Sequence, residues 1–168
     1  MIRSAQVSEC GHFRYRLDRH WHRGYGNVCW VMLNPSTADA SVDDATIRKC
    51  IGFTKRWGAG GIVVVNLWPW RATDPKDLKR LVASPPVPWF PFKNAGAIRE
   101  AVEGSDEVVV AWGAHANRVN PDWTSHIAWK LRSMCRPMCL GVTKDDSPRH
   151  PLMLAYSTPL RPFDEEAA

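Results

Sequence analysis

Four short runs of apolar residues recur along the chain and set its predicted architecture. They cover residues 28–33, 62–65, 108–112 and 138–141, and none contains a charged side chain. Strands that are apolar on both faces are typical of a parallel sheet covered by helices, so the runs predict four buried strands. Ahead of them, Phe13, Tyr15 and Leu17 alternate with charged residues, and a glycine-containing turn follows at 20–27. This pattern predicts an N-terminal β-hairpin addition.

Segments of helical character separate the apolar runs. Helices are predicted over 45–57, 77–83, 94–103 and 123–132, the first capped by Asp43 or Asp44 and ended by Gly58. The proline-rich stretch 84–92 is expected to be a loop, and the tail after Tyr156 is expected to be frayed. The alternation predicts a single α/β domain over residues 1–168, a three-layer α/β/α fold with a central, mostly parallel four-stranded sheet.

Polar residues stand where the predicted strands end. Asn34 and Asn66 follow the first two strands, Gly113 follows the third, and the loop after the fourth leads to His150. In open α/β sheets, the loops beyond the carboxyl ends of the strands build the ligand crevice. We therefore expect these residues to converge on one site.

Charge and cysteine content indicate which kinds of binding partner the protein has. A formal net charge of +5 favours an anionic partner. The five cysteines form no C-x-x-C pair, and no paired-histidine helix accompanies them, so neither a disulfide framework nor a metal site is expected. No signal segment and no apolar run of about 20 residues is present, which predicts a cytoplasmic protein with no membrane partner.

Four segments, in this order, resemble motifs of the uracil-DNA glycosylase superfamily. Residues 33–36 (LNPS) are similar to its first motif, an apolar strand followed by Asp-Pro or Asn-Pro. The strand that ends at Asn66 is similar to the one closed by the Asn that reads the pyrimidine, and residues 109–113 to the strand that ends in Trp-Gly. Residues 149–152 (RHPL) resemble its His-Pro-Ser-Pro-Leu motif, shortened by two residues.

A closer resemblance is to a small bacterial and phage family of unknown function. Its members carry LNPSTAD, DD-x-TIR-x-C, VNL-x-x-x-RATDP and RHPL segments, and all four are present here. The glycosylase relationship is the more distant one of the two.

The glycosylase resemblance implies a DNA N-glycosylase of the base-excision repair type. Such an enzyme hydrolyses the N-glycosidic bond of uracil or a related base after flipping it out of single- or double-stranded DNA. The resemblance further implies a monomer that uses neither a metal nor a cofactor.

Three residues carry the implied chemistry. His150 would donate a hydrogen bond to a carbonyl oxygen of the leaving pyrimidine, and the Asn66 amide would read the N3–H and O4 edge of uracil. Asn34 would orient the attacking water, although an amide is a poor general base. The candidates for an assisting carboxylate are Asp39, Asp43 and Asp44. Purely structural roles also remain open for two of these residues. His150 could cap a loop, and Asn66 could form a hydrogen bond with the adjacent backbone.

The remaining site residues are predicted as two groups. The candidates for the aromatic that stacks on the base are Phe53 and Trp68, with Trp57 and Trp70 as alternatives. The predicted DNA contacts are Ser36, Thr37, Arg71, His115, Lys144, Arg149 and Leu152, the last of which, or Met153 beside it, would wedge into the base stack.

Two other functions remain open at this point. One is a nucleic-acid-binding module that kept the fold and lost catalysis, which the Asn at position 34 favours. The other is an enzyme acting on free or hypermodified nucleotides. Fold alone does not decide between them.

Overall fold

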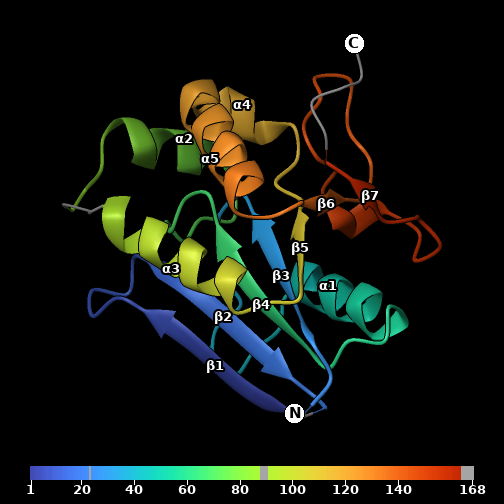
Figure 1. Cartoon of the computed structure of the whole chain (residues 1–168). Helices are drawn as coiled ribbons and strands as arrows, with labels where there is room; N and C mark the ends of the chain where they lie inside the picture. Colours follow the sequence, from blue (N-terminus) through green and yellow to red (C-terminus); the bar gives the residue numbers. More distant parts are fainter. Residues whose placement is uncertain (23, 88–90, 164–168) are drawn as a thin grey trace.

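Seven strands form one mixed sheet in the order β1-β2-β4-β3-β5-β6-β7 (Figure 1). The computed structural model describes residues 1–22, 24–87 and 91–163. The strands are β1 (Ile2–Val7), β2 (Arg14–His20), β3 (Asn27–Met32), β4 (Gly61–Asn66), β5 (Glu107–Val110), β6 (Met138–Cys139) and β7 (Arg161–Pro162). Within the described ranges, no helix is long and apolar enough to span a membrane.

The predicted four-stranded, mostly parallel sheet is wrong, although the chain is still α/β. The strands β4, β3, β5 and β6 pair in parallel, but β2 joins β4 antiparallel, β1 continues beyond β2, and β7 pairs antiparallel with β6. Leu17 stands opposite Val64, which makes β2 an integral part of the sheet. The predicted hairpin addition is therefore wrong as well, since β2 pairs with β1 and β4 and not with β3 across the turn at 20–27. The sequence pattern conceals this because Arg14, Asp18 and Arg19 are buried. Contacts from distant parts of the chain make that burial possible.

The six-residue strand β1 is missing from the sequence predictions, and so are two very short elements. The five-residue helix α4 (His115–Val119) and the two-residue strand β7 are too short to show a periodic pattern. The tail is not frayed up to Phe163, whose ring packs edge-on against Trp112 with centroids 5.7 Å apart. The rest of the predicted tail, residues 164–168, lies outside the described residues.

The four predicted helices are confirmed as α1 (Ala45–Arg56), α2 (Pro75–Ala83), α3 (Pro91–Glu103) and α5 (Pro121–Met134). Both α2 and α5 have a proline in the first turn, where the missing N–H leaves no hydrogen bond unmade, so they start slightly earlier than predicted. Helix α3 starts inside the expected loop 84–92, of which residues 88–90 lie outside the described residues.

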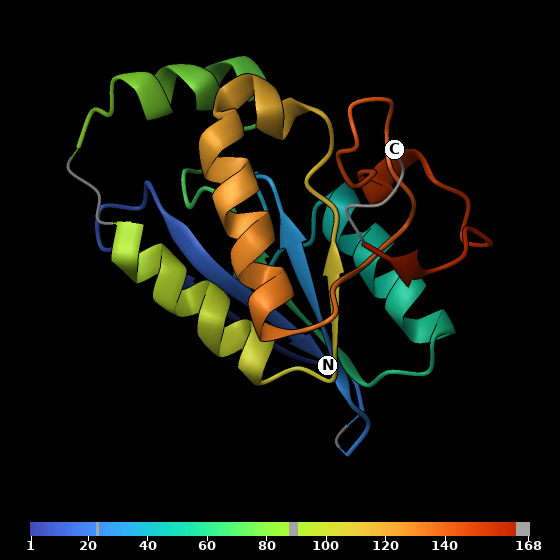
Figure 2. The same cartoon turned by 45° about the horizontal axis from the view of Figure 1, so that its top comes forward.

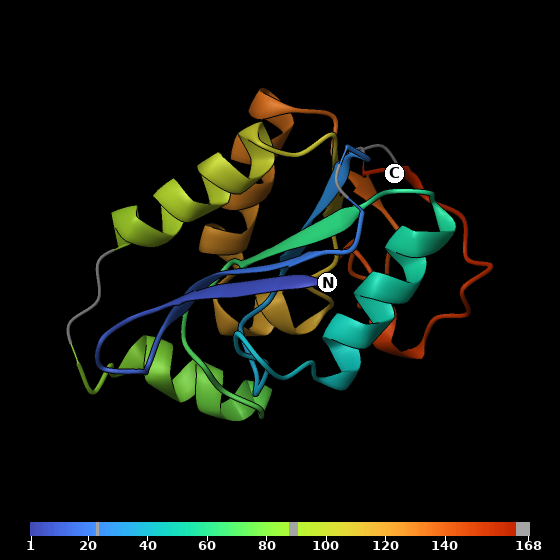
Figure 3. The same cartoon turned by 90° about the horizontal axis from the view of Figure 1, so that it is seen from below.

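The central strands β3, β4 and β5 bury both faces, as their unbroken apolar pattern predicts. Along β3, Cys29 and Val31 face the core cluster shared with α3 and α5, whereas Val28 and Trp30 face the cluster shared with α1. This follows from the two-residue period of a strand. Figures 2 and 3 show the result, with α3 and α5 on one side of the sheet and α1 on the other.

An ion pair ties the segment before α1 to the sheet. Arg19 of β2 is fully buried, and its Nε donates to a carboxylate oxygen of Asp43 at 2.7 Å. Its terminal nitrogens donate to the carbonyls of Asp18 and Asp39, and Asp43 also pairs with Arg3. The position of the chain just ahead of α1 therefore depends on this pair.

We expect Asp43→Ala to lower the free energy of unfolding by about 3 kcal/mol, because it leaves the Arg19 charge buried without its partner. Urea denaturation measures the loss. The matched control is Asp77→Ala, since Asp77 and Arg80 form a pair whose side chains are 53% and 76% exposed. That variant should lose less than about 1 kcal/mol. Equal losses in both variants would contradict the role of the buried pair.

Candidate functional site

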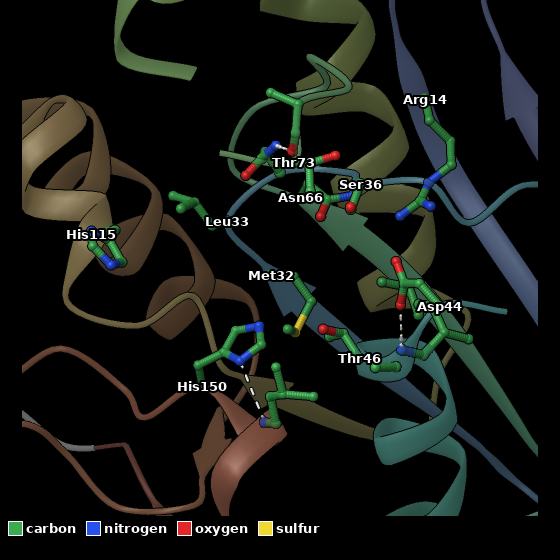
Figure 4. A pocket seen from close by; sticks show the side chains of 16 residues that line it. Arg14, Met32, Leu33, Ser36, Asp44, Thr46, Asn66, Thr73, His115 and His150 are labelled. Carbon is green, nitrogen blue, oxygen red and sulfur yellow. Dashed lines mark hydrogen bonds between the residues drawn. The ribbon is translucent and has the colours of Figure 1, made fainter. Parts of the chain in front are cut away.

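A pocket of about 420 Å³ opens where β3 and β4 end, between the start of α1 and the loop that carries His150 (Figure 4). It brings together Asn34, Asn66 and His150, which the sequence places in three separate loops. The lining residues are Arg14, Met32, Leu33, Asn34, Ser36, Asp44, Ala45, Thr46, Ile47, Val64, Asn66, Ala72, Thr73, His115, His150 and Leu152. The pocket is thus an apolar floor ringed by polar groups, the usual form of a small-molecule site.

Asn66 is the most deeply placed polar group of the pocket. It is the last residue of β4, in register with Met32 of β3, and is 1% exposed. Neither Oδ1 nor Nδ2 of its amide has a hydrogen-bond partner among the described residues, although its backbone carbonyl accepts from Asn94. A buried amide without partners costs about 1–3 kcal/mol or more. Asn66 therefore offers a donor and an acceptor that the protein itself leaves unused.

Asn34 organises the loop after β3. Its amide nitrogen lies within hydrogen-bond distance of three carbonyls, those of Pro35 (3.0 Å), Trp70 (3.2 Å) and Ala72 (2.7 Å). This ties the loop after β3 to the loop after β4 and sets Ser36 beside Thr73 at the pocket. Only the amide oxygen of Asn34 is left for a ligand or a water.

His150 presents an N–H donor from the opposite side of the pocket. Its Nδ1 accepts from the backbone N–H of Leu152 at 3.3 Å, at the start of the 3₁₀ turn η1 (Pro151–Met153). Burial lowers the pKa of His150, with His115 acting in the same direction and Asp44 opposing it. The neutral ring with Nδ1 as acceptor carries its proton on Nε2.

A close approach to Gly113 holds His150 in place. Gly113 adopts a φ of 74°, in the left-handed region that favours glycine. A Cβ atom at this position would lie 3.4 Å from the Cβ of His150. The Trp-Gly motif after β5 thus packs against the histidine.

We expect NMR to find His150 neutral with its proton on Nε2 at neutral pH. A long-range ¹H–¹⁵N correlation spectrum distinguishes the two tautomers, and its pH titration should show protonation only below the ordinary value of 6.5. Because the folded-state pKa is depressed, stability is fully present above 6.5 and is lost as pH falls through the lower folded value. His150→Gln should reduce that loss. An Nδ1–H tautomer, or an unchanged pH dependence in the variant, would contradict this assignment.

Asp44 is the one carboxylate among the lining residues of the described chain. It is the N-cap of α1, where one of its oxygens accepts from the backbone N–H of Ile47 at 2.8 Å. Its second oxygen accepts no hydrogen bond from the described residues. The N-cap residue of α1 thus also brings a carboxylate to the pocket.

Asp39 and Asp43, the other two candidates for an assisting carboxylate, are used elsewhere. Asp39 accepts from the backbone N–H groups of Ser41 and Val42, and these bonds lower its pKa to about 2. Asp43 pairs with Arg19 and Arg3. Neither lines the pocket, which leaves Asp44 for chemistry there.

Arg14, Thr46 and Thr73 line the pocket but are missing from the sequence predictions. Both threonines lie within segments singled out as motifs, TIR and RATDP, which is the signal that would have found them. Nothing in the alternating pattern of β2 distinguishes Arg14 from Arg16, which pairs with Asp18.

The predicted stacking aromatics belong to the core. Phe53 is 0% exposed and packs among Trp30, Trp57 and Tyr156, and neither Phe53 nor Trp57 lines the pocket. Phe53 belongs to the core because it lies on the face of α1 that covers the sheet.

The same holds for the two tryptophans after β4. Trp68 packs on Trp123 with centroids 5.6 Å apart, and Trp70 packs on Phe13 at 4.4 Å. Both are buried away from the pocket. A ligand there meets Met32 and other apolar side chains in place of a large ring.

The predicted DNA contacts divide into three groups. Ser36, His115 and Leu152 line the pocket itself. Thr37 and Arg71 line an adjoining depression that shares Ser36 with it. The last two, Lys144 and Arg149, are exposed on the loop that leads to His150 and do not line the pocket.

At the rim of the pocket, η1 exposes two apolar side chains. Leu152 is 40% exposed and Met153 is 89% exposed, directly after His150. Large exposed apolar side chains beside a pocket commonly mark a contact surface.

Comparison with known proteins places the chain in a family. No curated protein and no solved structure matches the chain. A family described as "Protein of unknown function (DUF1643)" matches residues 14–152, a span that begins at Arg14 and ends at Leu152 and so contains every residue that lines the pocket. The chain therefore belongs to the DUF1643 family.

Proposed function

We propose that the protein hydrolyses the N-glycosidic bond of uracil or a related base in DNA. The observation that carries the proposal is the Asn66 amide, which is buried at the pocket with both polar atoms unpaired. The order of the strand-end motifs, similar to that of uracil-DNA glycosylases, supports the same function by analogy.

An amide that offers one acceptor and two donors is suited to a base edge. The N3–H of uracil would donate to Asn66 Oδ1, and the O4 carbonyl would accept from Nδ2. Cytosine presents the opposite pattern at these positions, so Asn66 would distinguish the two bases in the orientation that its amide adopts. A mismatched base would leave polar groups of Asn66 and of the base without hydrogen bonds and away from water. That cost is what would make the amide selective.

His150 would stabilise the departing base. When the bond between C1′ and the base nitrogen breaks, its electron pair goes to the base, and negative charge develops on a ring carbonyl. A neutral histidine with a proton on Nε2 can donate a hydrogen bond to that oxygen. The water oxygen bonds to C1′, and its two hydrogens end on the new hydroxyl and on the released base.

Asp44 would take the proton of the attacking water. It supplies the carboxylate that the first motif lacks, and its second oxygen has no other role in the described structure. Asn34 would help to orient the water through its remaining amide oxygen, since its nitrogen is engaged with the loop carbonyls. This division assigns proton transfer to a carboxylate and positioning to an amide.

A DNA strand would reach the pocket over the rim formed by η1. There Leu152 and Met153 would fill the gap left by the flipped nucleotide. Arg71, Lys144 and Arg149 would contact phosphates on either side, which matches the net positive charge.

Base release is the measurement that tests this function. The purified protein is incubated with single-stranded and duplex oligonucleotides bearing uracil, substituted uracils, hypoxanthine or xanthine, and free base is quantified by mass spectrometry. We expect release of at least one base together with an abasic site. Salt-sensitive DNA binding without any release would select a non-catalytic binding module instead.

A second candidate function is an enzyme that acts on free or hypermodified nucleotides. The buried cation Arg14 at the pocket favours it, because a free nucleotide carries an anionic phosphate that a guanidinium can bind. Release from a nucleoside or nucleotide but from no oligonucleotide would select this function.

A further inference from the structure

Arg14 places a buried cation at the pocket that the proposed reaction does not use. It is the first residue of β2 and is 2% exposed. One terminal nitrogen donates to the Ala38 carbonyl at 2.7 Å, whereas Nε has no hydrogen-bond partner in the part of the chain that the structure describes. Figure 4 shows the guanidinium on the same side of the pocket as Asn66 and Ser36, with His150 on the opposite side.

The same strand contains a second buried arginine, which has an ion-pair partner. Arg19 is paired with Asp43 and donates to further backbone carbonyls. Arg14 forms no ion pair with any carboxylate of the described residues. Since an unpaired buried charge is costly, its presence at a pocket indicates a partner that arrives from outside the chain.

No carboxylate of the described lining residues forms an ion pair with Arg14, although the charge of Asp44 partly offsets the effect of burial on the Arg14 pKa. Asp44 is the one acidic group of the described lining residues, and it caps α1 without pairing with Arg14. Burial lowers the pKa of Arg14 to about 10, so the side chain is still protonated at neutral pH. The wall that holds Arg14 and Asn66 therefore presents a cation beside an unpaired amide.

We propose that the pocket selects a base with an anionic substituent, such as a carboxylate, next to the edge read by Asn66, and that Arg14 binds this substituent. That the ligand is a base rests on the proposed function. The anionic character rests on Arg14 alone. If Asn66 reads O4 of a pyrimidine, the group that meets Arg14 is attached to the neighbouring ring carbon, C5.

A guanidinium is well matched to a carboxylate at this position. Its Nε and a terminal N–H can donate two parallel hydrogen bonds to the two oxygens, and such charge-assisted pairs are stronger than neutral ones. A neutral base would leave the buried cation without a hydrogen-bonded anion. Selection thus arises from the cost of the wrong ligand as well as from the attraction of the right one.

Binding of two nucleosides of nearly equal shape tests the inference. Calorimetry compares deoxyuridine carrying a carboxylate at C5 with the same nucleoside carrying a carboxamide at C5. We expect the wild-type protein to bind the carboxylate at least about tenfold more tightly. Arg14→Gln should remove that preference, and Arg14→Lys should keep part of it, since a lysine keeps the charge but not the paired donors.

The control is Arg99→Gln, because Arg99 is exposed on α3, on the opposite side of the sheet from α1. It should bind both nucleosides as the wild type does, and thermal unfolding should show that the Arg14 variants are folded. Equal affinities in the wild type, no binding of either nucleoside, or a preference that survives in Arg14→Gln would overturn the inference.

The binding assay needs no base release, so the two proposals fail separately. A carboxylate preference in a protein that releases no base would contradict the glycosylase function only. Release of uracil by a protein with no such preference would contradict the role of Arg14 only.

Discussion

Replacing Asp44 with asparagine is expected to slow base release by at least about 100-fold while leaving the fold intact. Asparagine caps a helix about as well as aspartate does, so α1 keeps its first hydrogen bond to Ile47. What the variant loses is the ability to accept a proton, and general-base catalysis typically contributes about 10²–10⁴ in rate. Single-turnover rates of base release, beside thermal unfolding curves, measure both effects.

A matched aspartate provides the control for this variant. Asp74 caps α2 through the same kind of bond, to the backbone N–H of Lys76, and does not line the pocket. Asp74→Asn should leave the rate of base release unchanged. An equal loss in both variants would show that Asp44 acts through helix stability and not through the water.

Asn66→Ala is expected to lower the rate of base release by at least about 100-fold, the cost of losing oriented donors in a closed site. Its effect on stability should be unlike that of an ordinary buried asparagine. Because neither polar atom of the Asn66 amide has a partner, the variant should keep its free energy of unfolding within about 1 kcal/mol. Kinetics and urea denaturation of the same preparation test the two statements together.

Asn120→Ala should show the opposite combination. Asn120 caps α5 by accepting from the backbone N–H of Trp123 at 2.9 Å, so its loss should cost about 1 kcal/mol and leave the rate alone. A stable Asn66→Ala protein of normal activity would remove Asn66 from the site. A strongly destabilised one would show that its amide has a structural partner after all.

The two buried arginines illustrate how a fold can keep a group for a ligand. Arg19 is satisfied by Asp43 and by backbone carbonyls, whereas Arg14 keeps Nε without a partner at the pocket. Unsatisfied polar groups lower stability, and proteins retain them where function requires it. Arg14 and Asn66 are two such groups on the same wall.

The sequence predicts the pocket well where it depends on strand ends. The apolar runs locate β3, β4 and β5 because both faces of these strands are buried, and the residues that follow then have to meet at one edge. Asn34, Asn66 and His150 are found in this way. The helix cap at Asp44 can also be predicted from the sequence, because its hydrogen bond joins two residues only three positions apart.

Features that depend on contacts between distant segments cannot be predicted from the sequence pattern. The alternation in β2 suggests a half-exposed strand, yet Arg14 and Arg19 are both buried and bonded to groups from the loop before α1. Phe53 and Trp68 look like base-stacking candidates because their positions follow motifs, but the same positions face the core. Periodicity assigns a side chain to a face of an element and does not reveal what packs against that face.

The rate of free-base release tests the central claim most directly. Wild-type protein and Asn66→Ala are compared under single-turnover conditions on the oligonucleotide that the wild type cleaves fastest, with the base quantified by mass spectrometry. Our account predicts release by the wild type and a rate at least about 100-fold lower in the variant. Absence of release from every base-modified oligonucleotide, or equal rates for the two proteins, would contradict it.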